Sequence, residues 1–245
     1  IRQQRMIKDF MSYDSLNSTR SLLKRVIVFT LMFESLGAAY IFMTWDPSVP
    51  FAHAGERLFH SIFHSISAFN NAGFSTFSGG LFEPGVRNSY IMHLGIAALV
   101  FFGGIGITVL NDLFDPVRMR RRLREPWRRL EPGSRLALYT GLVLLLAGAL
   151  VFGLVEARNP AQLVEGGFRQ QNWFEQTITA VFQSMITRTA GFNTTDIGIL
   201  ATPTLLFFIF LMFIGAGSGG TGGGVKTSTF SVIFLSALST IRGKR

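Results

Sequence analysis

Two short segments of similar sequence carry the chemistry that this chain offers. The first is Ala72-Gly73-Phe74-Ser75-Thr76 and the second is Ala190-Gly191-Phe192-Asn193-Thr194. Glycine adopts positive φ at little cost, so a turn at glycine can direct successive backbone carbonyls to one axis, where they replace the water around a dehydrated cation. We therefore expect two cation-coordinating turns, which are formed by the backbone of Asn71, Ala72, Gly73, Phe74, Thr189, Ala190, Gly191 and Phe192.

Each turn follows an apolar segment that is too short to cross a bilayer. These segments are residues 56–70 and 173–187. At about 1.5 Å per residue, a helix of about 15 residues is about 22 Å long, whereas the hydrocarbon core is about 30 Å thick. We expect both to be re-entrant pore helices, because non-helical backbone at membrane depth is tolerated only where it is buried in protein or lines a water-filled path. The carboxyl end of each helix would then present partial negative charge to the cation.

The two glycines, Gly73 and Gly191, lie 118 positions apart, which indicates a duplicated unit. In the first unit, residues 26–114, we expect membrane spans at 26–45 and 88–114; the second unit is residues 136–245. The predicted fold class is an all-α integral membrane protein with two helix–pore-helix–helix repeats, re-entrant filter loops and a broken last helix.

A glycine-rich stretch interrupts the last hydrophobic segment. Broken membrane helices mark permeation paths, so we expect residues 215–227 to form a gating loop. Its gate residues are Gly215, Gly217, Ser218, Gly219, Gly220, Thr221, Gly222, Gly223, Gly224 and Lys226. A phosphate-binding P-loop would need glycine directly before lysine, but here Val225 precedes Lys226. The Lys226 ammonium is expected either near the pore axis, where it repels cations, or at the cytoplasmic surface.

The composition places the chain in a membrane. Of its 245 residues, 48% are hydrophobic and only 15% are charged. It contains no cysteine, which excludes disulfides and thiolate metal sites. It also lacks a nucleophile elbow, a carboxylate pair or another catalytic constellation, so we expect neither an enzyme nor an organic cofactor. Because it begins with Ile1 and has no signal peptide, we expect it to be an excised part of a longer protein.

The net charge of +9 is distributed as the positive-inside rule requires. Seventeen cations fall within residues 2–25, 118–135 and 242–245, against four in the segments expected on the outer side. We therefore predict a cytoplasmic or interfacial helix over residues 1–25 and a basic cytoplasmic linker over residues 115–135. This topology accounts for the arginines without a nucleic-acid partner. The expected surroundings are the lipid bilayer of the plasma (inner) membrane, which the chain crosses several times.

Four polar residues have more than one interpretation. Glu34 lies within a span and is either functional or paired with a cation or a backbone end. His60 and His64 have the i, i+4 spacing of a zinc pair, but no third ligand is near, which favours structural packing beside the outer mouth. Arg188 precedes the second turn, where its charge would repel a cation, so its side chain is expected to point back to an acid or to free carbonyls.

Three motifs in this order resemble a known superfamily. They are Ser65–Phe74 (SISAFNNAGF), Thr187–Thr194 (TRTAGFNT) and Gly219–Thr227 (GGTGGGVKT). They are similar to the second filter, the third filter and the intramembrane gating loop of the Trk/Ktr/HKT superfamily of potassium transporters. The similarity runs nearly end to end and is greatest to the bacterial Ktr-type K⁺-translocating membrane subunit.

This resemblance implies four repeats around one pore, of which the chain holds only the second and third. The remaining first and fourth repeats, a second copy in a homodimer and a cytosolic ring of nucleotide-binding regulatory subunits are the implied partners, and K⁺ is the implied transported ion. Gly73 and Gly191 are compatible with K⁺. In related plant transporters, however, the glycine position of the first repeat distinguishes K⁺ from Na⁺. A Na⁺-permeable or Na⁺-coupled transporter of the same fold therefore stays open, as does a non-conducting membrane scaffold.

Overall fold

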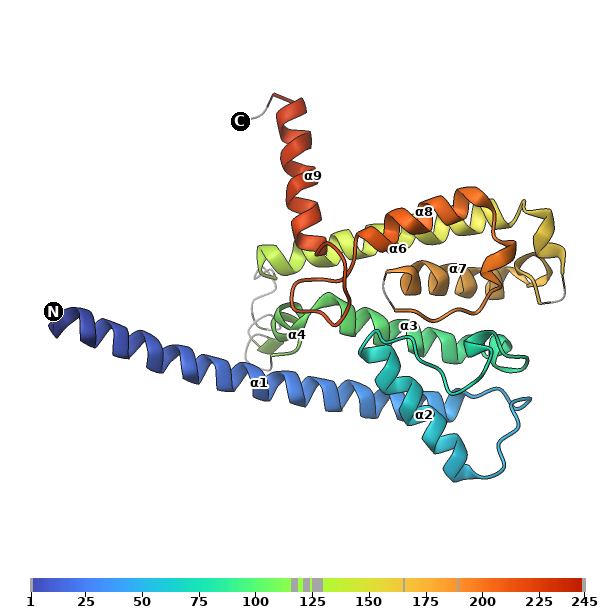
Figure 1. Cartoon of the computed structure of the whole chain (residues 1–245), viewed down its shortest axis with the longest axis horizontal. Helices are drawn as coiled ribbons and strands as arrows, with labels where there is room; N and C mark the ends of the chain where they lie inside the picture. The colour runs from blue at the N-terminus through green and yellow to red at the C-terminus, as the bar shows by residue number, and fades with distance from the viewer. Residues whose placement is uncertain are drawn as a thin grey trace.

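The structure is a computed structural model of the 245-residue chain. It describes residues 2–115, 119–120, 124, 130–164, 166–188 and 190–243, and for residues 2–19 and 21 it describes the backbone only. Most of the basic linker over residues 115–135 lies outside the described residues. The regular elements of the described part are helices, which form two groups that lie side by side (Figure 1).

The first group contains a long helix, a short helix and a bent helix pair. They are α1 (Arg2–Thr44), α2 (Ala54–Phe69), α3 (Tyr90–Ile105) and α4 (Ile107–Phe114), with the 3-10 turns η1 (Gly80–Phe82) and η2 (Val86–Asn88) between α2 and α3. α1, α2 and α3 pack against one another. The aromatic ring of Phe33 on α1 stacks on Phe69 and on Phe102, with ring centroids 5.6 Å and 4.9 Å apart. This apolar core fixes the carboxyl end of α2.

The second group has its long and short helices in the same order as the first group, and it packs on the first group. It contains α6 (Pro132–Glu156), α7 (Trp173–Thr187), α8 (Thr202–Phe213) and α9 (Thr227–Ile241), with the 3-10 turns η3 (Pro160–Leu163), η4 (Phe168–Gln170) and η5 (Ile197–Ile199). α7 packs against α3 and so joins the two groups, whereas α9 projects away from the helix layer (Figure 1). The last hydrophobic segment is broken between α8 and α9, as the glycine-rich stretch predicts.

The segment predicted as a cytoplasmic or interfacial helix is continuous with the first predicted span. Both belong to α1, one helix of 43 residues, and the position of the amino-terminal part relative to the membrane stays a prediction. Neither glycine nor proline occurs between Arg2 and Gly37, so the sequence contains no strong helix breaker there. Leu22–Thr44 and α6 are long and apolar enough to cross a membrane, and the bent pair α3 and α4 becomes a third candidate if it is counted as one span.

The predicted single span over residues 88–114 is divided into two helices. The chain bends by 104° between α3 and α4. Gly106 at the bend has φ 94°, and a Cβ at this position would lie only 2.2 Å from the Ser218 carbonyl oxygen. Glycine therefore permits both the bend and the close approach of the stretch between α8 and α9.

A buried carboxylate holds the carboxyl end of α6 to the start of α8. Oε1 of Glu156 accepts hydrogen bonds from Thr204 Oγ1 (2.5 Å) and from the Ala201 N–H (3.0 Å). Its Oε2 accepts from Asn159 Nδ2 (2.8 Å) and Gln162 Nε2 (3.0 Å). Because four donors surround it, the fully buried charge is compensated, and it fixes the entry of α8.

The long helix crosses the short helix in the same way in both groups. Ser65 of α2 donates a hydrogen bond to a carbonyl of α1 (2.7 Å), and Ser184 of α7 donates to a carbonyl of α6 (2.8 Å). In each case the residue that accepts the hydrogen bond lies three positions before a glycine of the long helix. A Cβ on Gly37 would lie 2.4 Å from the Ser65 oxygen, and a Cβ on Gly148 would lie 2.1 Å from the Ser184 oxygen. The crossings have matching geometry, as expected for duplicated units.

We expect Gly148→Ala to destabilise the protein by about 1–3 kcal/mol, since the added methyl overpacks the crossing of α6 with α7. Gly153 of the same helix is the matched control, because its nearest neighbour would be 4.0 Å from an added Cβ. Gly153→Ala should gain up to about 1 kcal/mol of helix propensity. Thermal unfolding of the full-length protein in detergent measures both. Equal melting temperatures for the two variants would show that the crossing tolerates a methyl.

Candidate ion-conducting site

The first predicted turn directly follows the carboxyl end of α2. The N–H of Asn71 donates to the Ala68 carbonyl (3.1 Å), and the N–H of Ala72 donates to the Ser67 carbonyl (2.8 Å). Asn71 and Gly73 then adopt positive φ, 52° and 72°, and Asn71 is the one non-glycine residue to do so in the described part of the chain. These left-handed conformations end the helix and redirect the backbone.

The second predicted turn follows α7 in the same manner. The Ala190 N–H donates to the Ile186 carbonyl (3.0 Å), and Gly191 has φ 82°. Thr189, the first residue of this predicted turn, lies outside the described residues. The side chain of Phe192 is buried, whereas that of Phe74 in the first turn is 68% exposed. The two turns thus have similar backbone conformations at their glycines, but their phenylalanine side chains lie in different surroundings.

The two turns meet backbone to backbone. A Cβ on Gly73 would lie 2.5 Å from the Ala190 oxygen and 2.6 Å from the Gly191 Cα, and a Cβ on Gly191 would lie 3.1 Å from the Gly73 Cα. No side chain separates the turns at this point, because both residues are glycine. The structure therefore brings together the two predicted turns, each at the carboxyl end of a short helix, where the helix dipole favours a cation.

Side chains of α2 hold the segment that follows the first turn. Ser67 Oγ donates to the Phe74 carbonyl (2.8 Å), His64 Nε2 lies 3.0 Å from Ser75 Oγ, and His60 Nδ1 lies 2.5 Å from Thr76 Oγ1. The described residues contain no group of three or more His, Cys, Asp or Glu side chains that could hold a metal ion. The two histidines thus anchor the segment that follows the first turn.

Gln183 of α7 has the corresponding role in the second group, and the sequence analysis missed it. Its buried Nε2 lies 3.2 Å from Thr194 Oγ1 and 2.8 Å from Thr195 Oγ1. The available signal was a glutamine within an apolar helix, followed by paired hydroxyl residues after the turn. Each short helix thus fixes its own turn with a polar side chain.

The glycine-rich loop, residues 214–226, packs against the bend between α3 and α4. The Gly217 N–H donates to the Gly104 carbonyl (2.7 Å), and the Thr221 N–H donates to the Gly103 carbonyl (3.1 Å). In return, the Gly219 carbonyl accepts from the α4 residue Ile107 (3.2 Å). The predicted gate residues therefore form one ordered loop that is bonded to the broken helix beside the first turn.

Lys226 lies partly buried at the end of the glycine-rich loop. Its Nζ donates a hydrogen bond to the Gly222 carbonyl (3.1 Å), within the same loop. The ammonium therefore stabilises the fold of the glycine-rich loop.

Two other charged residues near the turns have unexpected partners. Glu34 Oε1 accepts a hydrogen bond from Asn70 Nδ2 (2.7 Å), so its partner is an amide side chain at the end of α2. Arg188 Nη2 lies 3.6 Å from the sulfur of Met185, and its buried Nε has no hydrogen-bond partner among the described residues. In the described residues Glu34 is therefore paired with an amide and with neither a cation nor a backbone end, and a functional role for it stays a prediction. The Arg188 Nε has neither an acid nor a carbonyl partner in this part of the chain.

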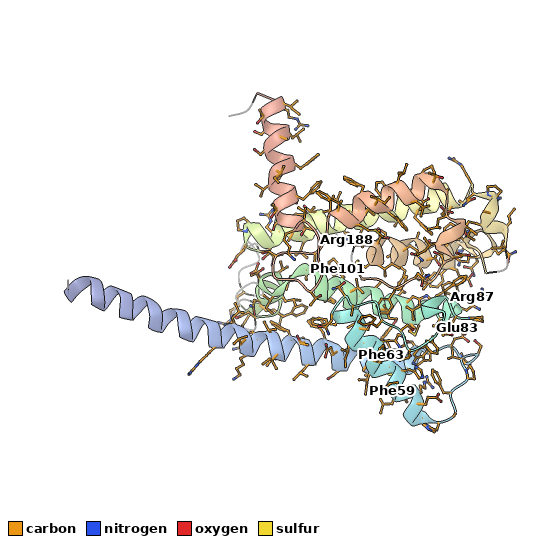
Figure 2. The ribbon with its side chains drawn as sticks, viewed as in Figure 1. Phe59, Phe63, Glu83, Arg87, Phe101 and Arg188 are labelled. Carbon is orange, nitrogen blue, oxygen red and sulfur yellow. The ribbon has the colours of Figure 1, made fainter. Side chains whose placement is uncertain are left out.

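A small cavity of ≈ 30 Å³, which is room for a water molecule, lies between the start of the first turn, the end of α7 and the glycine-rich loop. Its wall includes Asn71, Arg188 and Gly217. Figure 2 shows Arg188 and Phe101 between α3 and α6, and both residues line this cavity. The first turn, the residue before the second turn and the loop thus share one internal space.

The comparison with protein families decides the relationship that the three motifs suggest. The family model TrkH, described as cation transport protein, matches residues 1–245. The chain belongs to the TrkH family. This is a family of cation transporters and not of enzymes, which confirms both the resemblance and the prediction that the chain is not an enzyme.

Curated relatives of this TrkH-family chain are potassium uptake proteins. It is 36% identical over 248 residues to Ktr system potassium uptake protein B of Vibrio alginolyticus, and this alignment covers 100% of the present chain and 50% of the relative. It is 28% identical over 239 residues to the potassium/sodium uptake protein NtpJ of Enterococcus hirae, and this alignment covers 98% of the present chain and 49% of the relative. The chain thus spans about half the length of these relatives.

The fold also has a solved counterpart. The TrkH-family chain resembles the crystal structure of the potassium transporter TrkH from Vibrio parahaemolyticus with a TM-score of 0.66 and 19% sequence identity. The match covers 89% of this chain and 41% of that one. At this identity the likeness shows the fold alone.

Proposed function

We propose that this chain contributes two of the four repeats around a K⁺-conducting pore. Backbone carbonyls of residues 71–74 and 189–192 replace the hydration shell of the ion. The observation that carries the proposal is the backbone contact between Gly73 and Gly191, two left-handed glycines at the ends of two short helices. The names of the relatives, potassium uptake proteins, agree with this substrate.

The proposed architecture is two helix–pore-helix–helix repeats in the plasma membrane. α2 and α7 are the re-entrant pore helices, since 16 and 15 residues are too few to cross the hydrocarbon core. The equivalent serine and glycine crossings with α1 and α6 support this assignment. The glycine-rich loop is the gate, because it is the non-helical break beside the turns.

The partners of this half are part of the same proposal. The chain spans about half of its relatives' length, so the first and fourth repeats complete the pore. A second copy in a homodimer and a cytosolic ring of nucleotide-binding subunits complete the assembly. A pore for Na⁺ as well as K⁺, or one in which Na⁺ drives K⁺ uptake, is the second candidate, because one relative is named a potassium/sodium uptake protein.

Substitution of the turn glycines tests the proposed filter. In the full-length transporter, Gly73→Ser and Gly191→Ser should each reduce the preference for K⁺ over Na⁺ about tenfold. A Cβ at positive φ costs about 1–2 kcal/mol, and here it also meets the backbone of the other turn. Initial rates of K⁺ and Na⁺ uptake in cells that lack other K⁺ uptake systems measure the effect.

Gly133→Ser is the matched control, because a Cβ at Gly133 has no neighbour within 4 Å. It should transport both ions as the parent does. If both turn variants keep the parent's selectivity, these glycines are not part of the filter. If the parent reaches the membrane but moves no cation, the chain belongs to a non-conducting scaffold.

A further inference from the structure

One side chain of the glycine-rich loop bonds directly to the first turn. Thr221 Oγ1 accepts a hydrogen bond from Asn71 Nδ2 (2.6 Å) and donates one to the Phe69 carbonyl (3.1 Å). The Thr221 N–H donates to the Gly103 carbonyl of α3 (3.1 Å). A single residue thus links the loop to the last residue of α2, to the first turn and to the broken helix.

Both groups that Thr221 contacts need a partner. Asn71 is held at φ 52°, which is sparsely populated by residues other than glycine, and its amide is restrained by Thr221 and the Val100 carbonyl (3.5 Å). The Phe69 carbonyl belongs to the last turn of α2, where carbonyls lack intrahelical partners. If the loop moves away, the turn loses both restraints at the start of the predicted coordinating segment.

The surface that receives the loop is built for close approach. A Cβ on Gly106 would lie 2.2 Å from the Ser218 oxygen of the loop, and a Cβ on Gly103 would lie 1.8 Å from the Phe69 oxygen of α2, to which Thr221 donates. On the loop side, a Cβ on Gly217 or Gly220 would lie 2.3 Å or 2.4 Å from a carbonyl oxygen of α3. Glycines on both sides therefore let the loop backbone reach α3 and place Thr221 against the turn.

We propose that Thr221 and the Asn71 side chain form a latch through which the gating loop sets the conformation of the first filter turn. Displacement of the loop then opens the path and at the same time loosens ion selectivity. Thr221 contacts no ion in this scheme and is a positioning residue. The inference rests on the proposed function, and it adds that the gate and the filter are coupled by one hydrogen-bonded pair.

The test compares Thr221, which belongs to the loop, with Thr108, which contacts the loop from α4. Thr221→Val keeps the shape of the side chain and removes its hydroxyl, so in the full-length transporter Na⁺ uptake relative to K⁺ should rise about two- to tenfold, with faster K⁺ uptake. Thr221→Ser restores the hydroxyl and should restore selectivity. Thr108→Val is the control, because Thr108 Oγ1 contacts the loop at the Ser218 carbonyl (3.5 Å) but no residue of the turn.

Asn71→Gly removes the same hydrogen bond from the other side and keeps positive φ accessible. It decides the question if Thr221→Val fails to accumulate in the membrane. In the Asn71→Gly background, Thr221→Val should change selectivity no further, since the pair acts as a unit. Additive effects, or faster K⁺ uptake with the parent's selectivity, would overturn the latch. If the parent takes up no K⁺, the proposed function fails and the latch with it. If the parent takes up K⁺ and both variants keep its selectivity, only the latch is wrong.

Discussion

We expect deletion of Ser218–Gly223 to raise K⁺ uptake by the full-length transporter about tenfold or more. The closed loop is bonded to α3 and α4 through three backbone hydrogen bonds, at Gly217, Gly219 and Thr221. Each contributes about 0.5–1.5 kcal/mol, and a loss of about 1.4 kcal/mol from the closed state shifts its equilibrium with the open state tenfold. The deletion removes two of these bonds together with the segment that we propose obstructs the path.

The ends of the loop make the deletion structurally acceptable. The Gly215 N–H donates to the Val225 carbonyl (3.1 Å), so the segments that enter and leave the loop lie side by side, and a shorter connection can join α8 to α9. Lys226→Gln should give a smaller rise, because it weakens only the hydrogen bond to Gly222. Uptake is normalised to the amount of each protein in the membrane. Variants that insert normally and transport no faster than the parent would show that the glycines serve helix packing alone.

Local signals predicted the elements that carry the turns. α7 has the bounds predicted for the second pore helix, residues 173–187, because Asn172 and Glu175 form a capping box at its start and Arg188 leaves the helical conformation at its end. The break between α8 and α9 was also predictable, since each glycine costs about 1 kcal/mol in a helix. In these segments the local preferences and the fold agree.

The bend at Gly106 and the contacts across the site could not be read from local sequence. Gly103, Gly104 and Gly106 have the spacing of ordinary packing glycines, and the bend follows from the loop that docks beside them and accepts the Ile107 N–H. Asn71 and Thr221 are separated by 150 positions, and no periodic pattern pairs them.

Gly103→Ala should abolish selective K⁺ uptake, with a loss of about tenfold or more. A Cβ at this position would lie 1.8 Å from the Phe69 oxygen and 2.9 Å from its carbonyl carbon, whereas real Cβ contacts essentially never fall below 3.0 Å. The end of α2 must therefore move by about 1.2 Å, the difference between 1.8 Å and 3.0 Å. Since Phe69 is followed within two residues by Asn71, this shift displaces the first turn and breaks the hydrogen bond of Thr221 to Phe69.

The neighbouring glycine provides the control for this effect. Gly104 lies in the same helix, but the nearest atom to an added Cβ is Asn71 Nδ2 at 3.9 Å, an ordinary contact distance. Gly104→Ala should therefore keep uptake and selectivity close to those of the parent, since it also replaces a weak helix former by a strong one. Initial rates of K⁺ and Na⁺ uptake, with membrane insertion measured in parallel, distinguish the two variants. If Gly103→Ala inserts normally and transports as Gly104→Ala does, the end of α2 does not set the geometry of the turn, because a displacement of more than 1 Å at a coordinating backbone would have changed selectivity.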